Sequence, residues 1–208
     1  MLAIIDYGVG NLRSVQKALE AVGANAILTG DPGVIREADR LVLPGVGAFG
    51  ECARRLRESR LDQHVLEAAE RGKPVIGLCV GLQLMFDEGH EFGVHAGLGL
   101  MRGRVVRFPG TGPRVPQIGW NQVEPGKSHP LMEGIANGTY FYFVHSYYVD
   151  AGDPTDVLAY TEYGIRYPSI CARGSVCGVQ FHPEKSQDAG LKLLRNFASM
   201  RMDVFAVE

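Results

Sequence analysis

The sequence has few cysteines, and this excludes a fold that is held together by disulfide bonds. Only four of its 208 residues are cysteine, too few for a disulfide framework to hold a chain of this length. We therefore expect free thiols and a cytoplasmic protein. We also expect no signal peptide, because no basic residues precede the short apolar run at residues 2–5.

The sequence also lacks an excess of either charge. It contains 21 Lys and Arg against 23 Asp and Glu, which gives no electrostatic basis for binding nucleic acid or an anionic membrane. No apolar run approaches the roughly 20 residues that cross a bilayer. No internal repeat or linker interrupts the chain, so we expect one domain over residues 1–208.

Two familiar binding motifs are incomplete. Gly8-Val9-Gly10 follows an apolar stretch, as in a dinucleotide-binding turn, but Arg13 stands where the third glycine is needed. His90-Glu91 is followed by His95, one residue too far along for a zinc-binding His-Glu-x-x-His helix. We therefore expect no bound dinucleotide, no metal site and no cofactor.

Short apolar stretches alternate with helical patterns in the first half of the chain, which predicts a mostly parallel sheet flanked by helices. Between residues 87 and 97 the sequence predicts a polar loop. The second half has closely spaced β-rich stretches, which indicates additional antiparallel strands in an α/β fold. The predicted strands are 2–5, 26–28, 40–43, 75–78, 104–108, 139–148, 157–163, 169–172 and 176–181, and the predicted helices begin after an Asn11 cap and at 51–58, 61–71 and 188–200.

The most informative pattern is Gly-Leu-Cys-Val-Gly at residues 77–81, between an apolar strand and a helix. Glycines on both sides of a nucleophile are typical of a nucleophile elbow, which exposes the nucleophile at the carboxyl end of the strand. The N-terminal N–H groups of the next helix would favour the thiolate of Cys79. Taken alone, the pattern also fits a buried, inert cysteine between packing glycines.

A second pattern, His182-Pro183-Glu184, follows an apolar strand near the end of the chain. A cysteine nucleophile needs a base, and an imidazole suits this role near neutral pH. Alternate residues of an extended segment face the same side, roughly 6–7 Å apart. Glu184 can therefore orient the imidazole as the acid of a serine triad does. Alone, such a pair is unspecific and more often has no catalytic role.

Together, residues 79–83 and 180–184 resemble the corresponding motifs of the class I glutamine amidotransferases, and the resemblance extends over nearly the whole chain. It implies the flavodoxin-like α/β fold of that family. It also implies a triad of Cys79, His182 and Glu184 that releases ammonia from glutamine. Gln83 matches a family position that helps bind the glutamine.

Further segments narrow the resemblance. The loop 44–50, Pro-Gly-Val-Gly-Ala-Phe-Gly, replaces the glycine pair of most members, and residues 119–121, 142–147 and 181–186 also match. These segments resemble the glutaminase subunits of imidazole glycerol phosphate synthase, an enzyme of histidine biosynthesis. The resemblance implies a heterodimer with a (βα)8-barrel cyclase subunit. The cyclase would receive the ammonia through its barrel and make imidazole glycerol phosphate and aminoimidazole carboxamide ribotide.

The resemblance assigns two further sets of residues. Those that line or close the glutamine pocket are Glu91, His145, Ser146 and Tyr147. Those near the subunit interface are Asn11, Trp120, Asn121, Tyr142 and Lys185. Sheet packing, loop burial or surface charge are the alternative explanations for Glu91, Trp120, Tyr142, Tyr147 and Lys185.

The loop at residues 44–47 should help to form an oxyanion hole, which needs N–H donors aimed at the substrate oxygen. Val80 N–H is one candidate donor, and Val46 or Gly47 should supply the other. Val46 is β-branched and resists positive φ. We therefore expect the Gly45–Val46 peptide of the free chain to present its carbonyl, not its N–H, to the site.

Three other functions fit parts of the sequence. A class I glutaminase of another synthase is one, although the valine-containing loop favours the histidine pathway. A stand-alone cysteine hydrolase or peptidase of related fold is another, which robust activity of the single chain would support. A non-catalytic binding module is the third, against which the complete Cys, His and Glu set argues.

Overall fold

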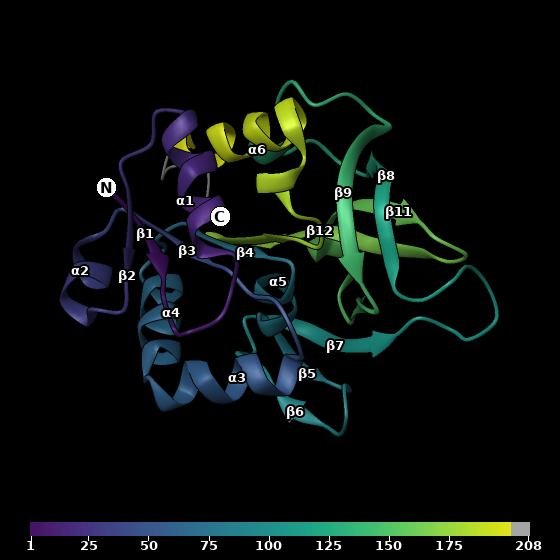
Figure 1. Cartoon of the computed structure of the whole chain (residues 1–208), viewed down its shortest axis with the longest axis horizontal. Helices are drawn as coiled ribbons and strands as arrows, with labels where there is room; N and C mark the ends of the chain where they lie inside the picture. Colours follow the sequence, from purple (N-terminus) through teal and green to yellow (C-terminus); the bar gives the residue numbers. More distant parts are fainter. Residues whose placement is uncertain (201–208) are drawn as a thin grey trace.

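The structure is a computed structural model that describes residues 1–200, so residues 201–208 of the predicted domain lie outside the described residues. Its main feature is a nine-stranded sheet with strand order β2-β1-β3-β4-β13-β12-β11-β8-β9 (Figure 1). The first five strands in this order are parallel. They are β2 (Ala26–Thr29), β1 (Leu2–Ile5), β3 (Arg40–Leu43), β4 (Val75–Leu78) and β13 (Val176–Val179).

The remaining four strands pair antiparallel, as the close spacing of the β-rich stretches predicts. They are β12 (Arg166–Arg173), β11 (Val157–Glu162), β8 (Gln117–Pro125) and β9 (Thr139–His145). All of β8 lies outside the predicted strands, because its sequence contains glycine and proline and its alternation is weak. The α/β class, with a parallel region and added antiparallel strands, is confirmed.

Helices cover both faces of the parallel region, and β1 shows why. Leu2 and Ile4 pack in a core with residues of α1 and α6, whereas Ala3 and Ile5 pack on the other face with residues of α3 and α4. Alternate residues of a strand point to opposite faces, so a continuous apolar strand needs cover on both. Figure 1 shows α1 and α6 above the sheet and α3 and α4 below it. The helices are α1 (Leu12–Ala21), α2 (Pro32–Glu37), α3 (Phe49–Glu58), α4 (Leu61–Glu70), α5 (Val80–Leu84) and α6 (Gln187–Ser199), with single 3-10 turns η1 (Pro130–Met132), η2 (Pro154–Asp156) and η3 (Pro183–Lys185).

A second, four-stranded sheet lies beside the helix α5, with strand order β10-β7-β5-β6. Its strands are β5 (Phe86–Gly89), β6 (His95–Ala96), β7 (Met101–Arg107) and β10 (Tyr147–Ala151). The prediction of a polar loop over residues 87–97 is therefore wrong. β5 carries two polar residues, Asp87 and Glu88, and forms because it pairs with β7, which the local sequence does not reveal.

Two helix starts also differ from expectation. α2 lies outside the predicted helices, although Asp31 caps it by accepting the Gly33 and Val34 N–H groups at 2.7 and 3.0 Å. At α1, Asn11 occupies the N-cap position but caps nothing; its Oδ1 instead accepts a hydrogen bond from the Ser14 hydroxyl at 2.9 Å. Within residues 1–200 no helix is both long and apolar enough to cross a bilayer.

Candidate active site

Cys79 lies between the carboxyl end of β4 and the start of α5. Its φ is 54°, in a region that non-glycine residues seldom adopt and that is characteristic of functional turns. The flanking glycines permit this turn. A Cβ at Gly77 would lie 2.5 Å from the Gly81 carbonyl carbon, and a Cβ at Gly81 would collide with the Leu43 carbonyl oxygen. The elbow expected from residues 77–81 is therefore present, and it explains the need for both glycines.

His182 and Glu184 lie beside this elbow because β13 pairs in parallel with β4, which brings the carboxyl ends of the two strands together. The Nδ1 atom of His182 is 2.8 Å from Glu184 Oε1, and the two side chains are only 4% and 1% exposed. Burial lowers the pKa of His182, but its interactions with Cys79 and Glu184 outweigh burial and raise that pKa to about 10. The imidazolium therefore stands next to the sulfur at neutral pH.

Cys79 and His182 line a cavity of about 490 Å³ at the carboxyl edge of the sheet. Most of its lining comes from four distant parts of the chain: the loop at residues 44–47, which we call the oxyanion loop after its expected role, the elbow, the β9–β10 turn and the segment after β13. Asn11, Glu91 and Pro116 add single residues from other segments. The lining residues are Asn11, Val46, Gly47, Cys79, Val80, Gln83, Glu91, Pro116, Val144, His145, Ser146, Tyr147, His182 and Lys185. Pro116 and Val144 were not expected there; no chemical signal marks either residue in the sequence.

The oxyanion loop directs a carbonyl, not an N–H, at the first residue after Cys79. The Gly45 carbonyl oxygen accepts the Val80 N–H at 3.3 Å, so that donor is occupied within the chain. This is the orientation expected from a β-branched Val46. The carbonyls on either side are anchored to the core: the Tyr7 hydroxyl donates to Pro44 at 2.6 Å and the Cys52 thiol donates to Val46 at 3.3 Å.

Hydrogen bonds between two buried side-chain amides connect the cavity wall to Cys79. Gln83 Nε2 donates to the Tyr147 carbonyl at 3.0 Å and to Gln180 Oε1 at 3.1 Å, and Gln180 Nε2 donates to Cys79 Sγ at 3.8 Å. His145 Nδ1 donates to the same Tyr147 carbonyl at 2.8 Å. Burial lowers the pKa of His145 to about 4, so this imidazole is neutral at pH 7. The sequence places Gln180 within a motif, but only the structure shows what its side chain contacts.

Four predicted site residues, Glu184, Trp120, Asn121 and Tyr142, lie outside the cavity wall, whereas Lys185 is one of the lining residues. Glu184 stands behind His182. The rings of Trp120 and Tyr142 meet edge to face with centroids 6.1 Å apart, and Lys185 Nζ lies 5.8 Å from the Tyr142 centroid. These three residues form one patch beside the cavity, which we call the aromatic patch. Asn121 is separate, because it alternates with Trp120 along β8 and donates its side-chain N–H to the Glu162 carbonyl at 2.9 Å.

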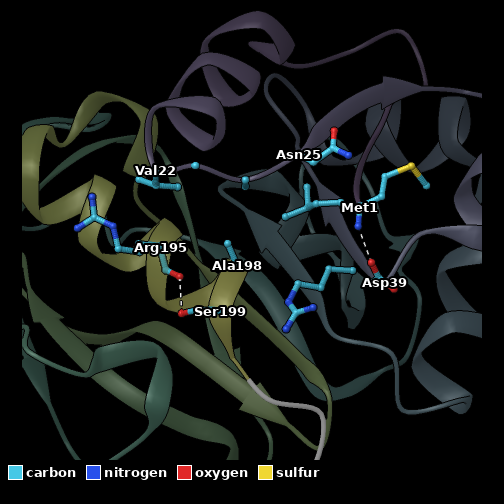
Figure 2. A pocket seen from close by; sticks show the side chains of 11 residues that line it. Met1, Val22, Asn25, Asp39, Arg195, Ala198 and Ser199 are labelled. Carbon is cyan, nitrogen blue, oxygen red and sulfur yellow. Dashed lines mark hydrogen bonds and ion pairs between the residues drawn. The ribbon is translucent and has the colours of Figure 1, made fainter.

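A second cavity, of about 300 Å³, lies at the opposite edge of the sheet (Figure 2). It is formed where β1, β2 and β3 begin, next to the last turn of α6, and it contains the ion pair between the Met1 amino group and Asp39. Ligands of parallel α/β sheets bind at the carboxyl ends of the strands, whereas this cavity is at the amino ends. It also brings no cysteine or histidine together among its lining residues. We therefore assign the chemistry to the cavity at Cys79.

The fold is shared with solved structures of low sequence identity. A structure described as "Crystal structure of glutamine amidotransferase" superposes with a TM-score of 0.74 at 21% identity, covering 95% of this chain and 98% of the other. "Structure of PurLQS from Thermotoga maritima" gives a TM-score of 0.73 at 18% identity, covering 94% of this chain and 96% of the other. At these identities the likeness concerns the fold alone.

Two bacterial relatives are much closer in sequence, and both are named "Imidazole glycerol phosphate synthase subunit HisH". The relative from Salinibacter ruber is 51% identical over 96% of this chain and 94% of its own length. The relative from Symbiobacterium thermophilum is 50% identical over 99% of this chain and 96% of its own length. The family model "Glutamine amidotransferase class-I" matches residues 3–200. The chain therefore belongs to the class-I glutamine amidotransferase family.

Proposed function

We propose that this protein is the glutaminase subunit of imidazole glycerol phosphate synthase, which hydrolyses glutamine and supplies ammonia to a cyclase subunit. The observation that carries the proposal is the strained Cys79 elbow beside a buried His182–Glu184 pair at the floor of a cavity of about 490 Å³. Relatives that carry the name of this subunit align over nearly the whole chain at about 50% identity.

The reaction follows from the positions of the three triad residues. The Cys79 thiolate attacks the carboxamide carbon of glutamine, and the tetrahedral intermediate collapses as His182 gives its proton to the departing ammonia. The resulting thioester is hydrolysed by a water that His182 deprotonates. This step releases glutamate and regenerates the thiolate. Glu184 holds the imidazole through Nδ1 and stabilises its protonated form.

Glu91 and Gln83 are the groups we assign to the amino-acid end of the substrate. The Glu91 carboxylate lines the cavity and also accepts the Phe49 N–H at 2.7 Å, which fixes it at the start of α3. A carboxylate held at the cavity wall is suited to pair with the ammonium group of glutamine. His145, Ser146 and Tyr147 also line the cavity.

We infer that the oxyanion loop regulates this reaction. An oxyanion hole needs donors, but here the Gly45 carbonyl occupies Val80 N–H. Rotation of the Gly45–Val46 peptide would free Val80 N–H and add the Val46 N–H. Because Tyr7 and Cys52 anchor the carbonyls on both sides, the rotation can be confined to that one peptide. We propose that the cyclase and its ligand favour the rotated state.

The aromatic patch is the surface we assign to the (βα)8-barrel cyclase, with Asn11 at its edge. Trp120 is 45% exposed and Lys185 is exposed beside the cavity mouth, so a barrel seated there would cover the path of the ammonia. We likewise propose that residues 1–208 form one glutaminase domain. Four free cysteines favour a cytoplasmic location.

The decisive experiment measures glutamate release by the purified chain, alone and with the cyclase subunit and its ligand. We expect low basal activity and strong activation by the liganded complex. Cys79→Ala should abolish glutamine-dependent turnover while the complex still forms and still makes product from added ammonia. Retained glutamine-dependent turnover in Cys79→Ala would contradict the proposal, and high activity of the single chain would instead support a stand-alone hydrolase.

A further inference from the structure

Gln180 is a fully buried polar residue that the mechanism above does not use. It follows β13, two residues before His182, and its side chain is 0% exposed. Its backbone N–H donates to the Ser169 carbonyl at 2.9 Å, which fixes the position of its backbone. Its side-chain amide joins two groups of the site, the Cys79 sulfur at 3.8 Å and the Gln83 amide at 3.1 Å.

The hydrogen bonds determine which way each amide points. Both N–H hydrogens of Gln83 are used, one by the Tyr147 carbonyl and one by the oxygen of Gln180. Because Gln180 directs its oxygen at Gln83, it must direct its N–H at the sulfur of Cys79. The oxygen of Gln83 then has no partner among the described residues and belongs to a side chain that lines the cavity, where a ligand N–H can reach it.

We propose that Gln180 is a further catalytic residue, whose side-chain N–H stabilises the Cys79 thiolate while its carbonyl oxygen holds Gln83 in the orientation that binds glutamine. The inference rests on the proposed role of Cys79 as nucleophile. No proton moves to or from Gln180, because a primary amide does not exchange a proton with a thiol as an acid or a base near neutral pH. Hydrogen bonds to an ionised group are stronger than those between neutral groups, so the contact favours the thiolate over the thiol.

The contact should act twice in each cycle. The sulfur carries its charge before attack, is neutral in the thioester, and regains its charge when it leaves during hydrolysis. An N–H donor held at the sulfur therefore assists both formation of the nucleophile and its departure from the acyl enzyme. His182 serves the nitrogen and the water in these steps, so the two residues have separate tasks.

The test uses two variants and iodoacetamide alkylation of the chain in its complex with the cyclase. Gln180→Glu keeps an oxygen for Gln83 but replaces the N–H at the sulfur with an acceptor. Gln180→Met removes both contacts with little change in volume. Alkylation of Cys79 is followed by mass spectrometry from pH 5 to 10. Cys52, Cys171 and Cys177 are 0% exposed, and burial raises the pKa of each, so they react slowly.

The alkylation midpoint is the pH at which the rate of Cys79 alkylation is half of its maximum. We expect both variants to move this midpoint to higher pH and to lower the alkylation rate at pH 7 by roughly three- to tenfold. Gln180→Met should also raise the KM for glutamine, and Gln180→Glu should raise it less. Gln117→Met is the matched control, because it removes another buried amide, one whose oxygen accepts from Tyr167 at 2.8 Å and which makes no hydrogen bond to the sulfur. This control should change the melting temperature without moving the midpoint.

An unchanged alkylation midpoint in folded Gln180→Glu and Gln180→Met would overturn the proposal. A change in the KM for glutamine with an unchanged midpoint would refute the contact with sulfur as well. Failure of the proposed function looks different, because Cys79→Ala would then retain glutaminase activity or the unmodified chain would show no titrating alkylation at Cys79. If one Gln180 variant does not fold, the other still decides the outcome.

Discussion

At the scale of the residue, Glu184 helps to raise the pKa of His182 and orients its imidazole. Its Oε1 binds His182, and its Oε2 has no hydrogen-bond partner among residues 1–200. Gln at this position can keep an oxygen at Nδ1 and place its amino group where Oε2 lies now. We therefore expect Glu184→Gln to lower kcat roughly tenfold, whereas His182→Ala should lose roughly 10²–10⁴-fold, the usual contribution of a general base.

The same variant should change the pH dependence of glutaminase activity. Glu184 contributes to the raised pKa of His182. Glu184→Gln should therefore shift the limb of the pH–rate profile that His182 sets to lower pH, as measured with the complex. A profile that does not move, together with unchanged kcat, would remove Glu184 from the triad. The melting temperature serves as the control for folding.

His145 makes a prediction about stability instead. Its pKa falls from 6.5 in the unfolded chain to about 4 in the folded chain, mainly through burial. Protons therefore bind more readily to the unfolded state. The contribution of this histidine to the free energy of unfolding is complete above pH 6.5 and is lost as the pH falls through about 4.

The expected loss is about 3 kcal/mol between these limits. It is measured by urea unfolding at a series of pH values for the unmodified chain and for His145→Gln. The variant is less stable at pH 7, because it lacks the bonds of the imidazole to Tyr147 and Tyr167. The difference in stability between the two proteins should shrink as the pH falls; a constant difference would contradict the prediction.

At the scale of the element, the peptide that we propose rotates, Gly45–Val46, lies between two peptides whose carbonyls are anchored to side chains. Val46 is the residue whose φ must change when the Gly45–Val46 peptide rotates, and a β-branched side chain opposes that change. We expect Val46→Gly to raise the basal glutaminase rate of the isolated chain by roughly 10- to 100-fold, within the value of one oxyanion donor. Its stability should change little, because Val46 is 39% exposed.

Ala48→Gly is the matched control for this element. It adds the same backbone freedom at the N-cap of α3, outside the rotating peptide. Its basal rate should equal that of the unmodified chain. Equal basal rates for Val46→Gly and Ala48→Gly would show that the peptide orientation does not limit the free chain.

At the scale of the whole molecule, backbone hydrogen bonds connect the aromatic patch, which we propose binds the cyclase, to His182. The His182 N–H donates to the Tyr142 carbonyl at 2.9 Å, and the Lys185 N–H donates to the His182 carbonyl at 3.0 Å. Lys185 and Tyr142 belong to the aromatic patch. A partner that moves this patch therefore acts directly on the position of His182.

We expect Lys185→Ala to affect coupling more than chemistry. A single charged side chain at an interface contributes little affinity unless it is desolvated, so the dissociation constant should rise only about threefold. Loss of the side chain at the cavity mouth should let ammonia escape, which raises the ratio of glutamate to cyclase product above one. Lys127→Ala, at an exposed site bonded to the Thr155 carbonyl, is the control. An unchanged ratio for Lys185→Ala would contradict this role.

The sequence by itself determined the parts of the protein that are local. The pattern at residues 77–81 specified the elbow, since only glycine fits on either side of Cys79 in that turn. The alternation of apolar strands and helices specified the α/β class. The spacing of His182 and Glu184 predicted their contact, because side chains two positions apart can reach each other, although Glu184 lies in the 3-10 turn η3 and not in the expected extended segment.

Only the tertiary structure decided the contacts between distant segments. Pairing of β13 with β4 places His182 at Cys79, and pairing of β5 with β7 turns a polar segment into a strand. The hydrogen bond from Val80 N–H to the Gly45 carbonyl and that from the Gln180 amide to the Cys79 sulfur likewise join residues that are far apart along the chain, although the sequence predicted the orientation of the Gly45 carbonyl. Such contacts depend on strand register and packing, and these are properties of the whole sheet that no local pattern contains.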